Sequence, residues 1–192
     1  MRQYLTFILV CACALAAALV ARGQDAPAPA PDPAPAPTTT ATAPADDPDL
    51  VDRQLQRIID RYRRQVWHWQ RVMGRRVTVT LPNPPRALAD RVPVWRRIAR
   101  QTWTNARHPP HAAAWQCIHR FEGSWTDPAS PYYGGLQMDL GFQRRYGAYL
   151  LRRKGTADHW TPLEQMWVAE RALRAGRGFY PWPNTARTCG LL

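Results

Sequence analysis

Lysine and the acidic residues are scarce in this chain of 192 residues, whereas arginine is abundant. Lys154 is the only lysine, and 14 Asp and Glu residues stand against 26 Lys and Arg residues, which leaves a formal net charge of +12 at pH 7. A chain this basic favours polyanionic partners, such as anionic polymers, lipid headgroups or nucleic acid. The sequence shows no recognition-helix motif, so we expect no nucleic-acid partner.

Long hydrophobic runs are also scarce. The one long run, residues 4–20, follows Arg2 and has about 17 residues, the short limit for a membrane span. Ala21-Arg22-Gly23 then offers a small-x-small cleavage site. This pattern predicts a secretory signal peptide over residues 1–23 and an exported protein, with a retained membrane anchor as the alternative.

Cysteine is scarce as well, with four in the chain. Cys11 and Cys13 fall inside the expected signal peptide, which leaves Cys117 and Cys189. Two cysteines in an exported chain indicate one disulfide bond. The bond would close a loop of about 70 residues and stabilise the fold by about 2–4 kcal/mol.

Cys117 has two possible roles other than this disulfide. With His159 it could form a thiol-peptidase pair, but a nucleophile needs an unpaired thiolate. With His108, His111 and His119 it could hold zinc, but two prolines separate the first two histidines and the chain lacks a paired-cysteine motif. We therefore expect no metal and no cofactor.

The residues that are present divide the chain into four segments and predict a mainly α fold. After the signal peptide, residues 24–48 are rich in Pro and Ala with Ala-Pro repeats, which predicts a disordered linker. Residues 49–111 predict a basic helical region. Residues 112–192 predict a compact helical domain.

The basic region contains two predicted helices. Apolar residues recur in steps of four and three over residues 49–73, which predicts the first helix. The second would begin at Pro93, in the first turn where proline is tolerated, and end near Arg107. Between them, residues 77–81 (VTVTL) alternate as in a short strand.

Most of the positive charge lies in this region. Residues 53–111 carry fourteen Arg residues against Asp60 and Asp90. Two interpretations remain open. The helices could anchor the chain on an anionic polymer or bind another protein, or they could pack on the C-terminal domain and leave a solvated Arg face.

The most informative stretch, residues 115–138, places a glutamate between a predicted helix and a run of turn formers. Glu122 ends the helical pattern, and large apolar residues such as Phe121 and Trp125 lie on both sides of it. Desolvation favours the protonated form of a carboxyl group, which can then act as a general acid. Aromatic, glycine and amide residues follow over 132–137, and their chemistry suits sugar rings and N-acetyl groups. Together these residues predict one acid in a sugar-binding cleft.

Two further helices complete the predicted domain. Asp139 can cap one over about residues 140–153. Thr161-Pro162-Leu163-Glu164 is a capping box that opens another, which ends near residue 175. We expect Glu170 to be structural or exposed, and residues 177–192 to form a loop and tail.

Four motifs follow one another along residues 112–192: Glu122-Gly-Ser-Trp125, Tyr132-Tyr-Gly-Gly-Leu-Gln137, Glu164-Gln-Met-Trp-Val-Ala-Glu170, and Gly178-Phe-Tyr-Pro-Trp182 followed by Cys189. With these motifs, residues 112–192 resemble the transglycosylase-like core of the resuscitation-promoting factors. These are secreted actinobacterial enzymes with a small lysozyme-like fold that cut peptidoglycan glycan strands. The family usually has a Cys directly before its catalytic Glu, whereas Cys117 lies one helical turn earlier here, and the Glu-to-Trp spacing is shorter.

The resemblance implies a reaction with Glu122 as general acid. Glu122 would protonate the β-1,4 glycosidic oxygen between N-acetylmuramic acid and N-acetylglucosamine. Water would then give hydrolysis, as in a muramidase, and the 6-hydroxyl of the muramic acid would give the 1,6-anhydro product of a lytic transglycosylase. A two-carboxylate mechanism needs a second acid, for which Asp127 and Asp139 are the candidates near in sequence.

The expected partners are peptidoglycan glycan strands, anionic wall polymers bound by the Arg-rich helices, and other wall hydrolases, with the protein secreted or associated with the cell wall. The alternative is a glycan-binding module with weak or no catalysis that recruits other hydrolases. The expected substrate contacts are Tyr133, Gln137, Trp125, Tyr180 and Trp182.

Overall fold

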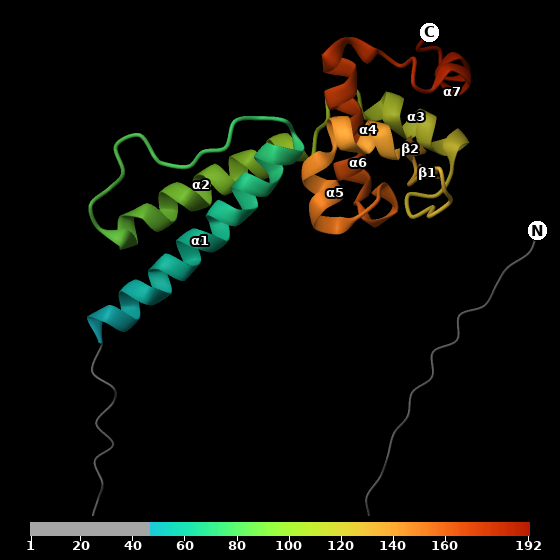
Figure 1. The fold of residues 1–192 in the computed structure, drawn as a ribbon. Coiled ribbons are helices and arrows are strands. Elements are labelled where there is room, and N and C mark those ends of the chain that lie inside the picture. Colours follow the sequence, from blue (N-terminus) through green and yellow to red (C-terminus); the bar gives the residue numbers. More distant parts are fainter. Residues whose placement is uncertain (1–46) are drawn as a thin grey trace, which may run out of the picture. The chain divides into compact units, whose positions relative to one another are not determined.

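The structure, a computed structural model, describes residues 47–192 (Figure 1). The expected signal peptide and nearly all of the expected linker therefore lie outside the described residues. Within the described part the chain is mainly helical, as predicted, and none of its helices is both long enough and apolar enough to cross a membrane.

Two long helices, α1 (Pro48–Val72) and α2 (Leu88–Ala106), form a helical hairpin (Figure 1). The Asp47 side chain caps α1 by accepting a hydrogen bond from the Asp49 backbone N–H. The buried residues of the hairpin form a small core of their own, with Ile59 and Val66 from α1 and Trp95 and Ala99 from α2. The helix expected over residues 49–73 is thus confirmed.

Two details predicted for this region are wrong. Residues 77–81 form no strand, because side chains of α1 take up the polar groups of Thr78: Gln70 accepts a hydrogen bond from its backbone N–H, and Trp67 donates one to its carbonyl oxygen. The second helix begins at Leu88, so Pro93 lies inside α2 rather than in its first turn.

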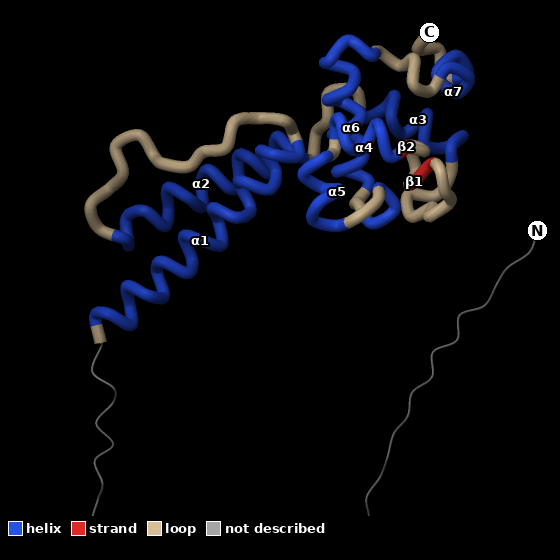
Figure 2. Tube along the Cα trace, in the orientation of Figure 1, coloured by secondary structure: helices blue, strands red, loops and turns tan. Residues whose placement is uncertain are grey.

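The C-terminal part of the described chain packs short helices against one another, with one small β-hairpin at one side (Figure 2). Strands β1 (Tyr132–Tyr133) and β2 (Met138–Asp139) pair antiparallel, with Tyr132 opposite Asp139. The helices are α3 (Ala112–Glu122), α4 (Leu140–Tyr146), α5 (Ala148–Lys154), α6 (Pro162–Ala172) and α7 (Pro183–Thr188), with a 3-10 turn at Ala157–His159 and a π-helical turn at Leu173–Arg177.

Capping predictions for this part are confirmed, but two helix boundaries differ from expectation. Asp139 caps α4, and Thr161 with Glu164 forms the capping box of α6. The helix expected over 140–153 breaks at Gly147, where the Trp160 ring packs so closely that a Cβ would lie 2.5 Å from it. The tail, expected as a loop, contains α7.

The buried core of this part is rich in tryptophan and is closed by the expected disulfide. Cys117 on α3 and Cys189 at the end of α7 are bonded, 72 residues apart in sequence. Next to the disulfide, Trp115 and Trp182 pack with their ring centroids 5.2 Å apart. Glu170 is buried and accepts hydrogen bonds from the Trp115 ring and the His111 backbone, so its role is structural.

The hairpin meets this core only through the ends of its helices. Val72 and Met73 belong to the larger core, and so does Ala106. Trp167 donates a hydrogen bond to the Ala106 carbonyl, and Arg174 donates one to the Met73 carbonyl at 2.6 Å. Packing against the C-terminal part therefore accounts for the helix ends and leaves the charged faces of α1 and α2 unexplained.

Candidate functional site

Glu122 is the last residue of α3, where the sequence predicted it. Gly123 follows with φ of 142°, a conformation that few other residues adopt, and the helix ends there. The Glu122 side chain is half-buried. The expectation of apolar groups on both sides is wrong in one respect, because Phe121 is 57% exposed and turns towards solvent.

Thr185 on α7 holds the Glu122 carboxylate in place. Its hydroxyl donates a 2.7 Å hydrogen bond to Oε1 of Glu122. The disulfide fixes this arrangement, because Cys189 ends α7 one turn after Thr185 and is bonded to Cys117 on the helix that carries Glu122. Sequence analysis missed Thr185, and its position four residues before a paired cysteine was the signal that could have found it.

A shallow hollow of about 240 Å³ opens beside Glu122. Glu122 is the only carboxylate among the described residues that line it. The other lining residues come from the β-hairpin, from the segment before α7 and from the first turn of α7, and they are Tyr132, Gln137, Pro181, Trp182, Pro183 and Asn184.

The Gln137 side chain is oriented by its neighbours. Gln137 has φ of 46°, and its Nε2 donates to Oδ2 of Asp127 at 2.9 Å and to the carbonyl oxygen of Gly134 at 3.0 Å. No described residue donates a hydrogen bond to Oε1 of Gln137. The amide oxygen is therefore the group that this residue can offer to a ligand N–H in the hollow.

The two candidates for a second carboxylate both serve as local caps. Besides binding Gln137, Asp127 accepts the backbone N–H of Ala129 at 3.0 Å, and this stabilises the turn after α3. Asp139 accepts the backbone N–H of Phe142 at 2.7 Å and caps α4. Neither aspartate lines the hollow with Glu122.

Of the five expected substrate contacts, the structure brings Gln137 and Trp182 into the hollow with Glu122. Trp182 is only 4% exposed and donates to the Leu136 carbonyl at 2.6 Å, so it is also a core residue. Tyr133 is half-buried against the core, and the preceding Tyr132, which sequence analysis did not single out, lines the hollow instead.

The remaining two expected contacts lie elsewhere. Trp125 stacks on the ring of His119, with centroids 3.9 Å apart and an interplanar angle of 21°. Tyr180 is 72% exposed. Neither residue lines the hollow.

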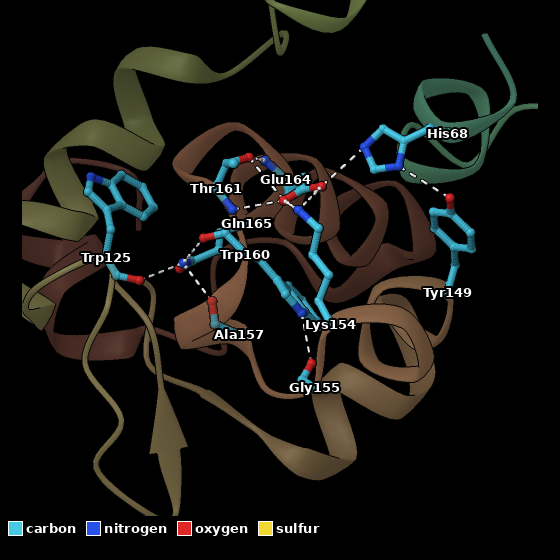
Figure 3. Close-up of polar contacts among 10 residues, drawn as sticks. All are labelled: His68, Trp125, Tyr149, Lys154, Gly155, Ala157, Trp160, Thr161, Glu164 and Gln165. Atoms are coloured by element: carbon cyan, nitrogen blue, oxygen red, sulfur yellow. Dashed lines mark hydrogen bonds and ion pairs between the residues drawn. The ribbon is translucent and has the colours of Figure 1, made fainter. Parts of the chain in front are cut away.

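The paired glycines of the β-hairpin turn, Gly134 and Gly135, pack directly against side chains of the protein itself. A Cβ on Gly134 would lie 2.5 Å from Oε1 of Gln165, and one on Gly135 would lie 2.6 Å from Nδ1 of His119. The buried Gln165 donates through Nε2 to the carbonyl oxygens of Trp125 and Ala157, each at 2.8 Å (Figure 3). The close approach at these glycines therefore serves to fix the loop behind the hollow.

A second polar cluster surrounds Glu164, which is 1% exposed (Figure 3). Lys154 donates to both of its carboxylate oxygens, at 2.8 and 2.7 Å, and His68 of α1 lies 3.1 Å from Oε1. Burial alone would raise the pKa of Glu164, but hydrogen bonds from His68, Lys154 and Thr161 outweigh burial and lower the pKa from 4.5 to about 2. This carboxylate is structural, and it joins α1 to α5 and α6.

Because Cys117 is in the disulfide, it has no thiolate for the thiol-peptidase or zinc alternatives. Among residues 47–192 no group of three His, Cys, Asp or Glu side chains is placed to hold a metal ion.

No family model, no curated protein and no solved structure matches this chain.

Proposed function

We propose that this protein cleaves peptidoglycan glycan strands at the β-1,4 bond between N-acetylmuramic acid and N-acetylglucosamine, with Glu122 as general acid. The observation that carries the proposal is that the half-buried Glu122 lines a hollow together with Gln137 and the aromatic residues Tyr132 and Trp182. We also propose that residues 112–192 form a small lysozyme-like domain, which the combination of short helices with one short β-hairpin supports.

The hydrogen bond from Thr185 supports different roles for the two carboxyl oxygens of Glu122. Thr185 donates to Oε1, so the transferable proton belongs on the other oxygen. Transfer of that proton to the glycosidic oxygen breaks the C1–O bond, releases the N-acetylglucosamine hydroxyl and leaves positive charge at C1 of the muramic acid. The oxygen of Gln137 can accept a hydrogen bond from an N-acetyl N–H group and so orient the sugar.

The next step is attack on C1 by an oxygen nucleophile. Hydrolysis by a two-carboxylate route needs a second acid about 5–10 Å from the first. Glu122 is the only carboxylate of the described chain in the hollow, which favours attack by the 6-hydroxyl of the same muramic acid. That hydroxyl loses its proton to the Glu122 carboxylate as the new C–O bond forms. The product is a 1,6-anhydro end, and the acid is regenerated.

We further propose that the protein is secreted and acts at the cell wall. The disulfide supports an oxidising compartment, because such bonds are rare in reducing cytosol. The apolar run at residues 4–20 supports export through a signal peptide over 1–23.

Mass spectrometry of digested peptidoglycan tests this function. The chain lacking residues 1–23 should release fragments with 1,6-anhydromuramic ends, and Glu122→Gln should release fewer by a factor of about 10² to 10⁴. Asp127→Asn is the matched control, and it should retain cleavage within about tenfold because Asp127 orients Gln137 and stabilises the turn after α3 but does not line the hollow.

Reducing ends in place of anhydro ends would overturn the intramolecular route and make the enzyme a hydrolase. Binding to the wall without cleavage by any of the three proteins would overturn the enzyme proposal. It would favour the alternative of a glycan-binding module that recruits other hydrolases.

A further inference from the structure

A second hollow, of about 320 Å³, lies on the outer face of α2, away from Glu122. Arg96, Arg97 and Arg100 line it, and all three are exposed. Gln101 and Thr104 add polar groups to the same surface. We call these five residues the α2 basic hollow.

The positive charge of the α2 basic hollow has no counter-charge in the described chain. The arginine ion pairs found in residues 47–192 are Arg53 with Asp47 and Arg63 with Asp60, and neither involves the hollow. Arg96 and Arg100 stand one helical turn apart, a spacing at which like charges repel. An anion bound among the three guanidinium groups would remove this repulsion.

A second basic surface lies on α1. Arg57, Arg61 and Arg64 are exposed and recur in steps of four and three, on the face opposite the buried Ile59 and Val66. At 1.5 Å per residue this row extends about 10 Å along the helix. Because α1 and α2 share one core and each turns its arginines away from it, the hairpin carries positive charge on two sides.

We propose that the hairpin binds a linear phosphodiester polymer of the cell envelope, with the α2 basic hollow as its main phosphate site. Guanidinium groups bind phosphate through paired, parallel hydrogen bonds, and every cation in these two surfaces is an arginine. A flexible polymer can contact both sides of the hairpin, whereas a planar bilayer meets one side at a time. The envelope location rests on the proposed function, and the phosphate chemistry does not.

This binding would give the two parts of the described chain different tasks. The hairpin would retain the protein on anionic polymer between glycan strands, and the disulfide-closed part would act on the strands themselves. Short hydrogen bonds, such as that from Arg174 to the Met73 carbonyl, join the hairpin to that part. A polymer that holds the hairpin therefore also holds the disulfide-closed part.

The test measures binding of the chain lacking residues 1–23 to synthetic poly(glycerol phosphate) at several salt concentrations. The variant Arg96→Gln, Arg97→Gln, Arg100→Gln should weaken binding at least tenfold at low salt and flatten its salt dependence. The matched control removes the same charge from α4 and α5 through Arg144→Gln, Arg152→Gln, Arg153→Gln, and it should weaken binding less than threefold.

Equal weakening in both triple variants would overturn the proposal, because charge alone would then explain binding. Tighter binding to phosphatidylglycerol vesicles, or to single-stranded DNA with the same number of phosphates, would overturn the choice of partner. Absence of binding by the unmutated chain would overturn the proposal altogether. Cleavage of peptidoglycan stripped of anionic polymer should be equal in the unmutated chain and the α2 variant, so failure here is separable from failure of the glycan-cleaving function.

Discussion

The hairpin of α1 and α2 exposes its charged side chains, whereas the disulfide-closed part from α3 to α7 buries some of its own. The hairpin leaves nearly all of its arginines exposed around a small core of four buried residues. The disulfide-closed part buries two carboxylates, Glu164 and Glu170, and satisfies each with several hydrogen bonds. Buried, fully bonded polar groups fix geometry, which a catalytic site needs, whereas exposed like charges form a surface for binding a partner.

The largest effect is expected from removal of the disulfide. By loop-closure entropy, a bond between residues 72 apart stabilises the fold by about 4 kcal/mol. The double variant Cys117→Ser, Cys189→Ser should lose about this much free energy of unfolding in a denaturant titration. Glycan cleavage should fall as well, because α7 carries Thr185 to Glu122.

Reductant provides the control for this prediction. It should destabilise the unmutated chain and leave the double variant unchanged. Amide exchange in the middle of α1 should be similar in both proteins, because the disulfide lies in the other part. Loss of protection throughout α1 would contradict the separation of the two parts.

The next effect concerns pH and Glu164. Its pKa is lowered in the folded state, so its carboxylate stabilises the fold fully above about pH 5, and this stabilisation is lost as pH falls towards 2. A fall from 4.5 to about 2 corresponds to about 3 kcal/mol. Glu164→Gln should therefore be less stable than the unmutated chain by about this amount at pH 7, and the difference should vanish near pH 2.

Asp52 of the hairpin is the matched control, since it is an exposed carboxylate on α1. Asp52→Asn should change the free energy of unfolding by less than about 0.5 kcal/mol at every pH. Thermal melts of the three proteins at pH 7, 4 and 2 make the comparison. A stability difference for Glu164→Gln that persists at the lowest pH would show that lost packing, and not charge, causes the effect.

Local sequence signals predicted much of this fold because they depend on short-range chemistry. The spacing of apolar residues in α1, the Asp139 cap and the Thr161–Glu164 capping box are all confirmed. So is the disulfide, which needed only the count of cysteines outside the expected signal peptide. Glu122 was placed correctly at a helix end because Gly123 follows it.

The failures depend on contacts between residues distant in sequence. The strand expected over 77–81 is absent because Gln70 and Trp67 bind its polar groups. The break at Gly147 comes from packing against Trp160, and Thr185 meets Glu122 although 63 residues separate them in sequence. No pattern within one segment contains that information.

The third effect tests whether tight packing at the turn of the β-hairpin leaves no room for a side chain in place of glycine. Gly135→Ala places a Cβ 2.6 Å from the His119 ring and 2.7 Å from the Trp125 ring, and both rings are stacked and cannot move easily. We expect a loss of about 2 kcal/mol in the free energy of unfolding. Gly176→Ala is the control: its φ of 83° imposes a cost of about 1 kcal/mol, but nothing lies within 4 Å of its Cβ. Equal losses would mean that packing at the turn is loose.

The smallest effect returns to the exposed arginines. Arg61→Gln with Arg64→Gln on α1 should change the free energy of unfolding by less than about 0.5 kcal/mol, because neither side chain has a hydrogen-bond partner in the described chain. Arg174→Gln removes one cation too, but also the 2.6 Å hydrogen bond to the Met73 carbonyl, and should cost about 1 kcal/mol. Denaturant titrations at low and high salt distinguish the loss of charge alone from the loss of a hydrogen bond.

A hairpin that becomes more stable when its arginines are removed, most of all at low salt, would show that the fold tolerates repulsion to keep this surface basic. A hairpin that loses stability would show that these two arginines hold α1 in place.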